Sequence, residues 1–139
     1  MMDFNFLGLV AALAAFLSIW WGHGGVRKIE ALLVRLWPPI LGASLLGIIF
    51  EIISARTNNI YISAACGILG VVFLWDAFEF YRQQNRIKKG HAPANPNNPR
   101  HVRILADFPA ATTLDWLDCN PRGQKYSAEE LAAMKANAK

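Results

Sequence analysis

The sequence predicts an all-α membrane protein with three transmembrane helices, a short amphipathic interfacial helix and an extended cytoplasmic C-terminal tail. Two observations support this fold class. Hydrophobic residues make up 54% of the 139 residues and charged residues only 17%, whereas soluble domains carry about 25% charged residues. The charges are also unevenly distributed, because residues 4–22 contain none while residues 82–103 contain several Arg and Lys and no acid. The chain therefore divides into a membrane part and a polar part.

Three apolar segments are long enough to cross a hydrocarbon core as helices, which takes roughly 17–25 residues. They cover about residues 4–21, 38–55 and 60–78. Pro38 and Pro39 suit the start of the second helix, where a missing N–H costs little. No Gly or Pro occurs between Val71 and Lys89, so the third helix should continue to about residue 89. We therefore predict a membrane domain over residues 1–89.

The segment between the first two spans is amphipathic. Its apolar residues recur at helical spacing, at Val26, Ile29, Leu33 and Leu36, and most of its charged residues lie off that stripe. This pattern predicts a short helix lying on the membrane surface over about residues 24–36. The alternative interpretation is a plain basic loop.

The polar part begins with a change of composition. Residues 90–100 contain three prolines and three asparagines, which is typical of an extended linker. Residues 101–139 then form a predicted cytoplasmic tail, in which Ser127 and Glu130 make a capping box that should open a helix over about residues 128–137. So short a tail rarely holds a core of its own, so we expect its apolar side chains to bury against a partner subunit or, alternatively, against residues 26–36. These predicted docking residues are Phe108, Leu114, Trp116 and Leu117.

One face of the third helix gathers polar residues. Asp76, Glu79, Gln83 and Arg86 follow helical spacing, which aligns them. An acid close to a membrane core is costly and usually paired. We therefore expect Asp76 or Glu79 to pair with Arg27 or Lys28. The full candidate polar cluster comprises His23, Arg27, Lys28, Glu30, Asp76, Glu79 and Arg86.

This cluster could be a proton or ion relay, or it could be a structural ion pair that fixes the first loop to the third span. The structural interpretation is favoured, because the cluster lies on one side of the membrane and only Glu51 lies near the other. In the middle of the spans, the polar residues that could form part of an ion path are Ser18, Ser44 and Ser63.

The sequence contains none of the motifs that commonly mark a metal, cofactor or catalytic site. Cys66 and Cys119 have no C-x-x-C or Cys/His ligand spacing, so no metal or cofactor is predicted. Hydrolase, kinase and dinucleotide motifs are lacking as well, and no enzyme activity is predicted. The basic run Arg82–Lys89 adjoins a span, so it suits anionic lipid headgroups better than nucleic acid.

Basic residues predict the topology. The first loop carries Arg27, Lys28 and Arg35, and six more Arg or Lys lie within residues 82–103 after the third span, whereas the N-terminus carries none. By the positive-inside rule the N-terminus should lie outside, and the first loop and C-terminus in the cytoplasm.

Around its first loop and after its third span the chain resembles the uncharacterised bacterial membrane proteins of domain-of-unknown-function family 4491. The resemblance covers about residues 5–100 and is carried by His23, Val26, Lys28, Glu30, Leu74-Trp75, Glu79, Gln84, Arg86, Lys88 or Lys89, Gly90, Pro93 and Asn95-Pro96. Two positions depart from the family pattern: Gly24-Gly25 replaces a His-Pro step, and His91-Ala92 replaces an aromatic pair. The resemblance implies three spans in a bacterial cytoplasmic (inner) membrane and no particular activity. Residues 97–139 have no counterpart in it.

Three functions fit these features. The first is a non-catalytic accessory or assembly subunit of a larger membrane complex, with lipid and other membrane subunits as partners. The second is a small ion or solute channel or transporter, which would require a homo-oligomer because three spans enclose little space. The third and weakest is a membrane enzyme or haem-binding subunit, for which His23 lacks a second axial histidine within the spans.

Overall fold

A computed structural model describes residues 5–137 of the chain. This part is helical, with the elements α1 (Phe6–Leu32), α2 (Trp37–Arg56), α3 (Ile60–Lys88), α4 (Pro99–Asp107), α5 (Trp116–Cys119) and α6 (Ala128–Ala136). Helices α1, α2 and α3 are long and apolar enough to cross a membrane. The predicted all-α class with three membrane-length helices is therefore confirmed. The expected start of the first span at residue 4 and the last two residues of the tail lie outside the described residues.

The chain divides into two compact units. The membrane unit holds the residues up to Ile29 together with Leu36–Tyr81, and the tail unit holds Glu30–Arg35 together with the residues from Arg82 onward. Both α1 and α3 begin in the membrane unit and end in the tail unit.

Helix α1 differs from the sequence prediction. It continues without a break through Gly24 and Gly25 to Leu32, so the residues expected to form a separate surface helix instead extend the first span. A glycine inside a helix costs only about 1 kcal/mol relative to alanine, which two long flanking stretches of good helix formers offset. At the other end, the Asn5 side chain accepts hydrogen bonds from the backbone N–H groups of Leu7 and Gly8, which caps the helix.

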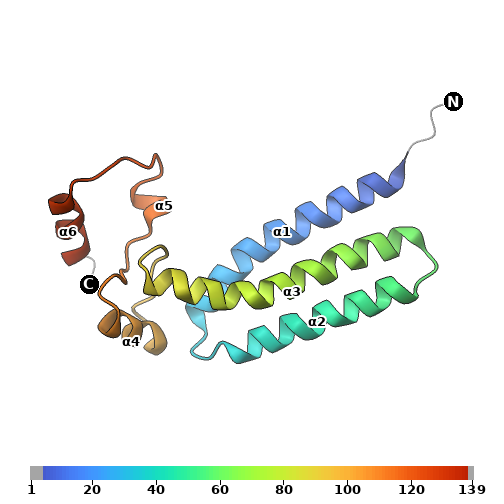
Figure 1. The fold of residues 1–139 in the computed structure, drawn as a ribbon, viewed down its shortest axis with the longest axis horizontal. Helices are drawn as coiled ribbons and strands as arrows, with labels where there is room; N and C mark the ends of the chain where they lie inside the picture. The colour runs from blue at the N-terminus through green and yellow to red at the C-terminus, as the bar shows by residue number, and fades with distance from the viewer. Residues whose placement is uncertain (1–4, 138–139) are drawn as a thin grey trace. The chain divides into compact units, whose positions relative to one another are not determined.

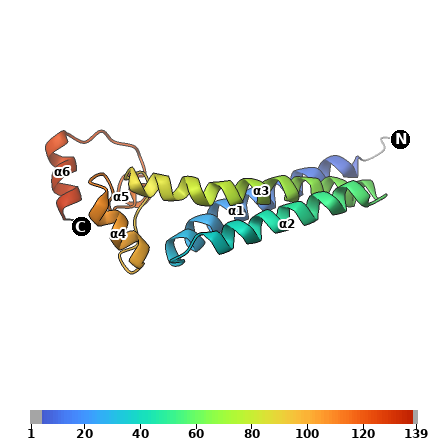
Figure 2. The ribbon, with the colours of Figure 1, turned by 60° about the horizontal axis from the view of Figure 1, so that its bottom comes forward.

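Helices α2 and α3 run side by side in opposite directions (Figures 1 and 2). Their contact depends on glycine, because a Cβ added to Gly47 would lie 2.7 Å from Cγ of Leu74. Near the turn, Ser54 Oγ donates to the carbonyl of Ser63 at 2.8 Å, and Ser63 Oγ donates to the carbonyl of Ser54 at 2.9 Å. Small residues and paired hydroxyls are the usual means of helix association in lipid.

The acid of the second span is part of the same contact. Glu51 lies against α3, since a Cβ on Gly70 would lie 2.6 Å from Glu51 Oε1. Asn59 then opens α3 by accepting the backbone N–H groups of Tyr61 and Ile62, as a helix N-cap does. The paired hydroxyls of Ser54 and Ser63 therefore join α2 to α3 at this end of the membrane unit, whereas Glu51 Oε1 is buried there without a hydrogen bond from the described residues.

The tail unit has a small core of its own. Buried apolar side chains come from the end of α3, from α4 and from the segments before and after α4, at Ile87, Ala92, Ala94, Ile104 and Ala111. Residues 90–100, expected from composition to be an extended linker, are thus packed: Ala94 N–H donates to the carbonyl of Thr112, and Asn98 is only 2% exposed. Asn98 also caps α4 by accepting the Arg100 N–H at 3.0 Å.

The last helix has the predicted start. Ser127 Oγ accepts the Glu130 N–H at 3.2 Å, and Glu130 Oε2 accepts the Ser127 N–H at 2.8 Å. The capping box expected from the sequence is confirmed, with the helix ending at Ala136.

Candidate functional site

Helix α3 places Asp76 near one end of its membrane-spanning part. Asp76 lies sixteen residues after Ile60, about 24 Å along the helix at 1.5 Å per residue. With a hydrocarbon core of about 30 Å, the carboxylate belongs close to a headgroup boundary. Trp75 directly precedes Asp76, and Trp20 and Trp21 stand near the end of the uncharged run of α1. Tryptophans are enriched at such membrane–water interfaces.

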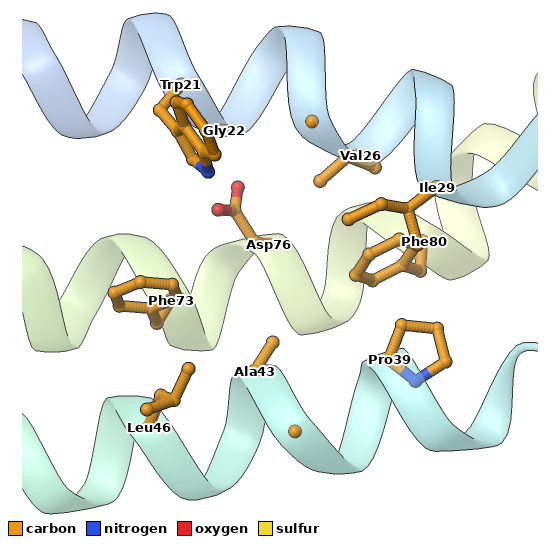
Figure 3. A pocket seen from close by; sticks show the side chains of 12 residues that line it. Trp21, Gly22, Val26, Ile29, Pro39, Ala43, Leu46, Phe73, Asp76 and Phe80 are labelled. Carbon is orange, nitrogen blue, oxygen red and sulfur yellow. The ribbon is translucent and has the colours of Figure 1, made fainter.

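The carboxylate of Asp76 points from α3 toward α1, where Trp21 and Gly22 lie (Figure 3). The approach to α1 is close, because a Cβ on Gly22 would lie 2.7 Å from Oδ1 and 2.8 Å from Oδ2 of Asp76. Only glycine at position 22 leaves room for the acid in this orientation.

Two apolar recesses meet at Asp76. One has a volume of about 260 Å³ and lies among all three helices, with Val26, Ile29 and Phe80 in its walls. The other, of about 290 Å³, lies between α1 and α3, with Leu17 and Leu69 in its walls. Both recesses are bounded by Trp21, Phe73 and Asp76.

The first recess exists because small residues face each other across it. Gly22 and Gly25 of α1 and Gly42 and Ala43 of α2 line it. The Trp21 ring lies along α1, with its Nε1 3.7 Å from where a Cβ of Gly25 would be. Replacing these residues by larger ones would fill the space with side chains, as in an ordinary packed helix interface.

The Asp76 carboxylate takes part in none of the hydrogen bonds or ion pairs formed within the described part of the chain. The groups near enough to act on its charge are His23 and Glu79. Glu79 is a second acid, and neither group forms a hydrogen bond or an ion pair with Asp76 within the described residues. The carboxylate thus has no fixed countercharge in direct contact.

A second buried acid lies in the tail unit, at the end of α1. Glu30 is fully buried, and its Oε1 accepts hydrogen bonds from Arg100 Nη1 at 2.8 Å and from His101 Nε2 at 3.2 Å. The other oxygen, Oε2, is buried and accepts no hydrogen bond from the described residues. The Arg100 guanidinium places a positive charge directly against this buried acid, as a buried charge requires.

His101 is held as one tautomer of the neutral imidazole. The backbone N–H of Asn95 donates to Nδ1 at 2.8 Å, so Nδ1 must carry a lone pair. The ring proton therefore lies on Nε2 and is donated to Glu30. His101 is fully buried, so its ring nitrogens are shielded from water. Both nitrogens have hydrogen-bond partners within the tail unit instead.

The side chains next to His101 cap the end of α1. Asn95 Nδ2 donates to the carbonyl of Ala31 at 2.9 Å, and Asn98 Nδ2 donates to the carbonyls of Ala31 and Leu33 at 3.0 and 3.1 Å. Arg100 Nη2 donates to the carbonyl of Glu30 at 2.6 Å. The last carbonyls of a helix lack intrahelical partners and carry partial negative charge, so two amides and a guanidinium suit them. This explains why α1 ends at Leu32 without glycine or proline.

The predicted polar cluster is divided between these two places. His23 and Glu79 lie near Asp76, and Glu79 is only 5% exposed. Glu30 instead pairs with Arg100 and His101. Asp76 forms no ion pair with Arg27 or Lys28 within the described residues, and the expected pairing of Glu79 with one of them stays a prediction. Among the others, Lys28 is exposed, and Arg86 donates to Gln83 at 3.2 Å.

The predicted docking residues differ in exposure. Leu117 is 65% exposed and Phe108 37% exposed, with Lys88 Nζ 5.1 Å from the Phe108 ring centroid. Trp116 is partly buried and its Nε1 donates to the carbonyl of Gly90 at 3.0 Å. Leu114 is half-buried.

Sequence reasoning missed Arg100, His101, Asn95 and Asn98 as one structural group. A local signal existed, since five of the seven residues at positions 95–101 are polar and two of these precede proline, which is unusual for a segment that serves only as a spacer. Their partners lie 64 to 71 residues earlier in the chain, so no periodicity could indicate the pairing.

Comparison with known proteins gives one match. A family model described as Domain of unknown function (DUF4491) matches residues 5–98. The matched segment includes Gly22, Glu30 and Asp76, and it ends at Asn98, the residue before α4. Searches of curated proteins and of solved structures returned no match.

Proposed function

This chain belongs to the DUF4491 family, and from its own side chains we propose that it is a non-catalytic accessory or assembly subunit of a larger membrane complex. The observation that carries the proposal is the tail unit, which is folded yet leaves apolar side chains uncovered. Leu117, Val102 and Phe108 are 65%, 49% and 37% exposed, although Ile104 of the same helix as Val102 is buried. A small folded unit with its own core and uncovered apolar groups suits docking to another protein.

The arrangement of polar groups in the spans supports a subunit rather than a pore. Ser54, Ser63 and Glu51 contact the neighbouring helix at one end of the membrane unit, and Asp76 lies near the other. The Oγ atoms of Ser18 and Ser44 each donate to the carbonyl four residues earlier in their own helix. A path for ions would need polar groups that face a shared space at intermediate depths.

The proposal is tested by extraction of native membranes in a mild non-ionic detergent, followed by native electrophoresis and mass spectrometry. We expect the chain to migrate with a different protein in fixed stoichiometry and Leu117→Glu to release it, because a charge placed in an apolar interface stays unpaired. Lys125→Glu, an exposed polar position of the same unit, is the matched control and should leave the assembly intact. Migration as a homo-oligomer would instead support the small channel or transporter.

We further propose that the protein resides in a bacterial cytoplasmic membrane with its N-terminus outside and its C-terminus in the cytoplasm. The concentration of basic residues in the first loop and after α3 supports this topology. In a Cys66→Ala background, an impermeant maleimide applied to intact cells should label Asn58→Cys, in the turn between α2 and α3. It should label Cys119, which is exposed, only after the membrane is permeabilised. The opposite pattern would reverse the topology.

A further inference from the structure

We propose that the space around Asp76 is a binding site for an amphiphilic organic cation, whose ammonium or phosphonium head lies against the carboxylate and whose apolar arms fill the two adjoining recesses. This inference is independent of the proposed function. It starts from a single negative charge, on Asp76, placed where two apolar cavities of about 260 and 290 Å³ meet.

The charge of the site selects a cation. A carboxylate near hydrocarbon is costly unless it has an opposite charge beside it, and the described part of the chain supplies neither a hydrogen bond nor an ion pair to Asp76. His23 and Glu79 are the groups near enough to act on its charge, and neither is a permanent cation. A positively charged ligand would supply what the site lacks.

The composition of the walls selects an organic cation rather than a metal ion. Within the described residues no three His, Cys, Asp or Glu side chains come together as a metal site would require. The walls are apolar and aromatic instead, with Trp21 and Phe73 beside both recesses and Phe80 in one of them. Aromatic faces attract organic cations, and tryptophan does so most strongly.

The space is provided by the absence of side chains. Gly22 allows the carboxylate to lie against α1, and Gly25, Gly42 and Ala43 leave one recess open. Figure 3 shows the arrangement, with Asp76 extending from α3 between the aromatic rings of Trp21, Phe73 and Phe80. The depth of Asp76, about 24 Å along α3 from its start, puts the head of a ligand near the membrane boundary and its arms among apolar groups.

Binding of tetraphenylphosphonium to the full chain in dodecyl maltoside, a non-ionic detergent without ammonium groups, tests the proposal by equilibrium dialysis. We expect saturable binding that Asp76→Asn weakens at least tenfold. Glu51→Gln is the matched control, because Glu51 is an acid of α2 that lies against Gly70 rather than at the recesses. Trp21→Leu, which keeps the charge and removes one aromatic wall, should weaken binding by a smaller factor.

Two further measurements settle the chemistry and the source of the cation. Tetraphenylborate has the same shape and the opposite charge, so it should not compete. Short-chain phosphatidylethanolamine added to the dialysis displaces the probe if a lipid ammonium is the natural occupant, and leaves it bound if a free amphiphilic cation is. The proposal is overturned if Asp76→Asn binds as the unchanged chain does, if Glu51→Gln loses binding equally, or if tetraphenylborate competes as well as the cation.

Discussion

Replacing Arg100 with alanine is expected to destabilise the tail unit by about 3–5 kcal/mol, the usual loss when one partner of a buried ion pair is removed. Glu30 would remain fully buried with His101 as its only hydrogen-bond donor among the described residues. The carbonyls of Glu30 and Leu33 would also lose the guanidinium that caps them. Hydrogen exchange of residues 30–35 and 95–101 in detergent would measure the loss locally.

Two comparisons make this prediction specific. Arg103→Ala removes the same charge from an exposed position on the same helix, and it should change exchange little. Glu30→Gln combined with Arg100→Ala should recover part of the loss, because the uncompensated charge is gone. If the loss of stability from Glu30→Gln and the loss from Arg100→Ala simply add in the double variant, Glu30 and Arg100 are not energetically coupled. The capping arrangement would then contribute little to stability.

Replacing Gly90 with alanine is expected to be at least as damaging. Gly90 has φ of +72°, a conformation that costs other residues about 1–2 kcal/mol. The added Cβ would also overlap the carbonyl oxygen of Ala110, a backbone atom that cannot turn aside. The carbonyl of Gly90 accepts the Trp116 N–H, so the required shift would disturb that hydrogen bond too. We expect a total loss above about 3 kcal/mol, in the range of severe core substitutions.

Gly123 provides the control for this change. Its φ is +65°, and a Cβ there would meet nothing within 4 Å. Gly123→Ala should therefore cost the conformational strain alone, and the difference between the two variants isolates the contact with Ala110. Thermal unfolding of both variants in detergent, followed by exchange at residues 87–94, gives the comparison. Equal losses of stability in Gly90→Ala and Gly123→Ala would show that the backbone near Ala110 moves away from the added Cβ without cost.

The sequence predicted those features that depend on neighbouring residues. Long runs without charge predicted the spans, because the hydrophobic requirement of a membrane is strong and local. Ser127 and Glu130 predicted the start of α6, since both partners of a capping box lie within one turn. The composition of residues 90–100 was misleading for the same reason: prolines and asparagines exclude regular helix locally, but they do not exclude packing and hydrogen bonding to a distant segment.

The candidate site could be predicted only in part. The helical spacing of Asp76 and Glu79 predicted that they share a face of α3, and in the structure His23 lies near enough to act on the charge of Asp76. The recesses were not predicted, because they depend on Gly22, Gly25 and Gly42 meeting across two helix contacts. The role of Glu30 was not predicted either, since its partner Arg100 lies 70 residues away.

The same separation sets an order of events during synthesis. The end of α1 leaves the ribosome 70 residues before Arg100 does, which at roughly 5–20 residues per second means a delay of about 4–14 s. All three hydrophobic segments are translated by the end of that interval, and until then Glu30 has neither Arg100 nor His101 available. Insertion into the bilayer can therefore precede closure of the tail unit, and a nascent chain arrested before residue 100 would lack the guanidinium that covers the carbonyls of Glu30 and Leu33.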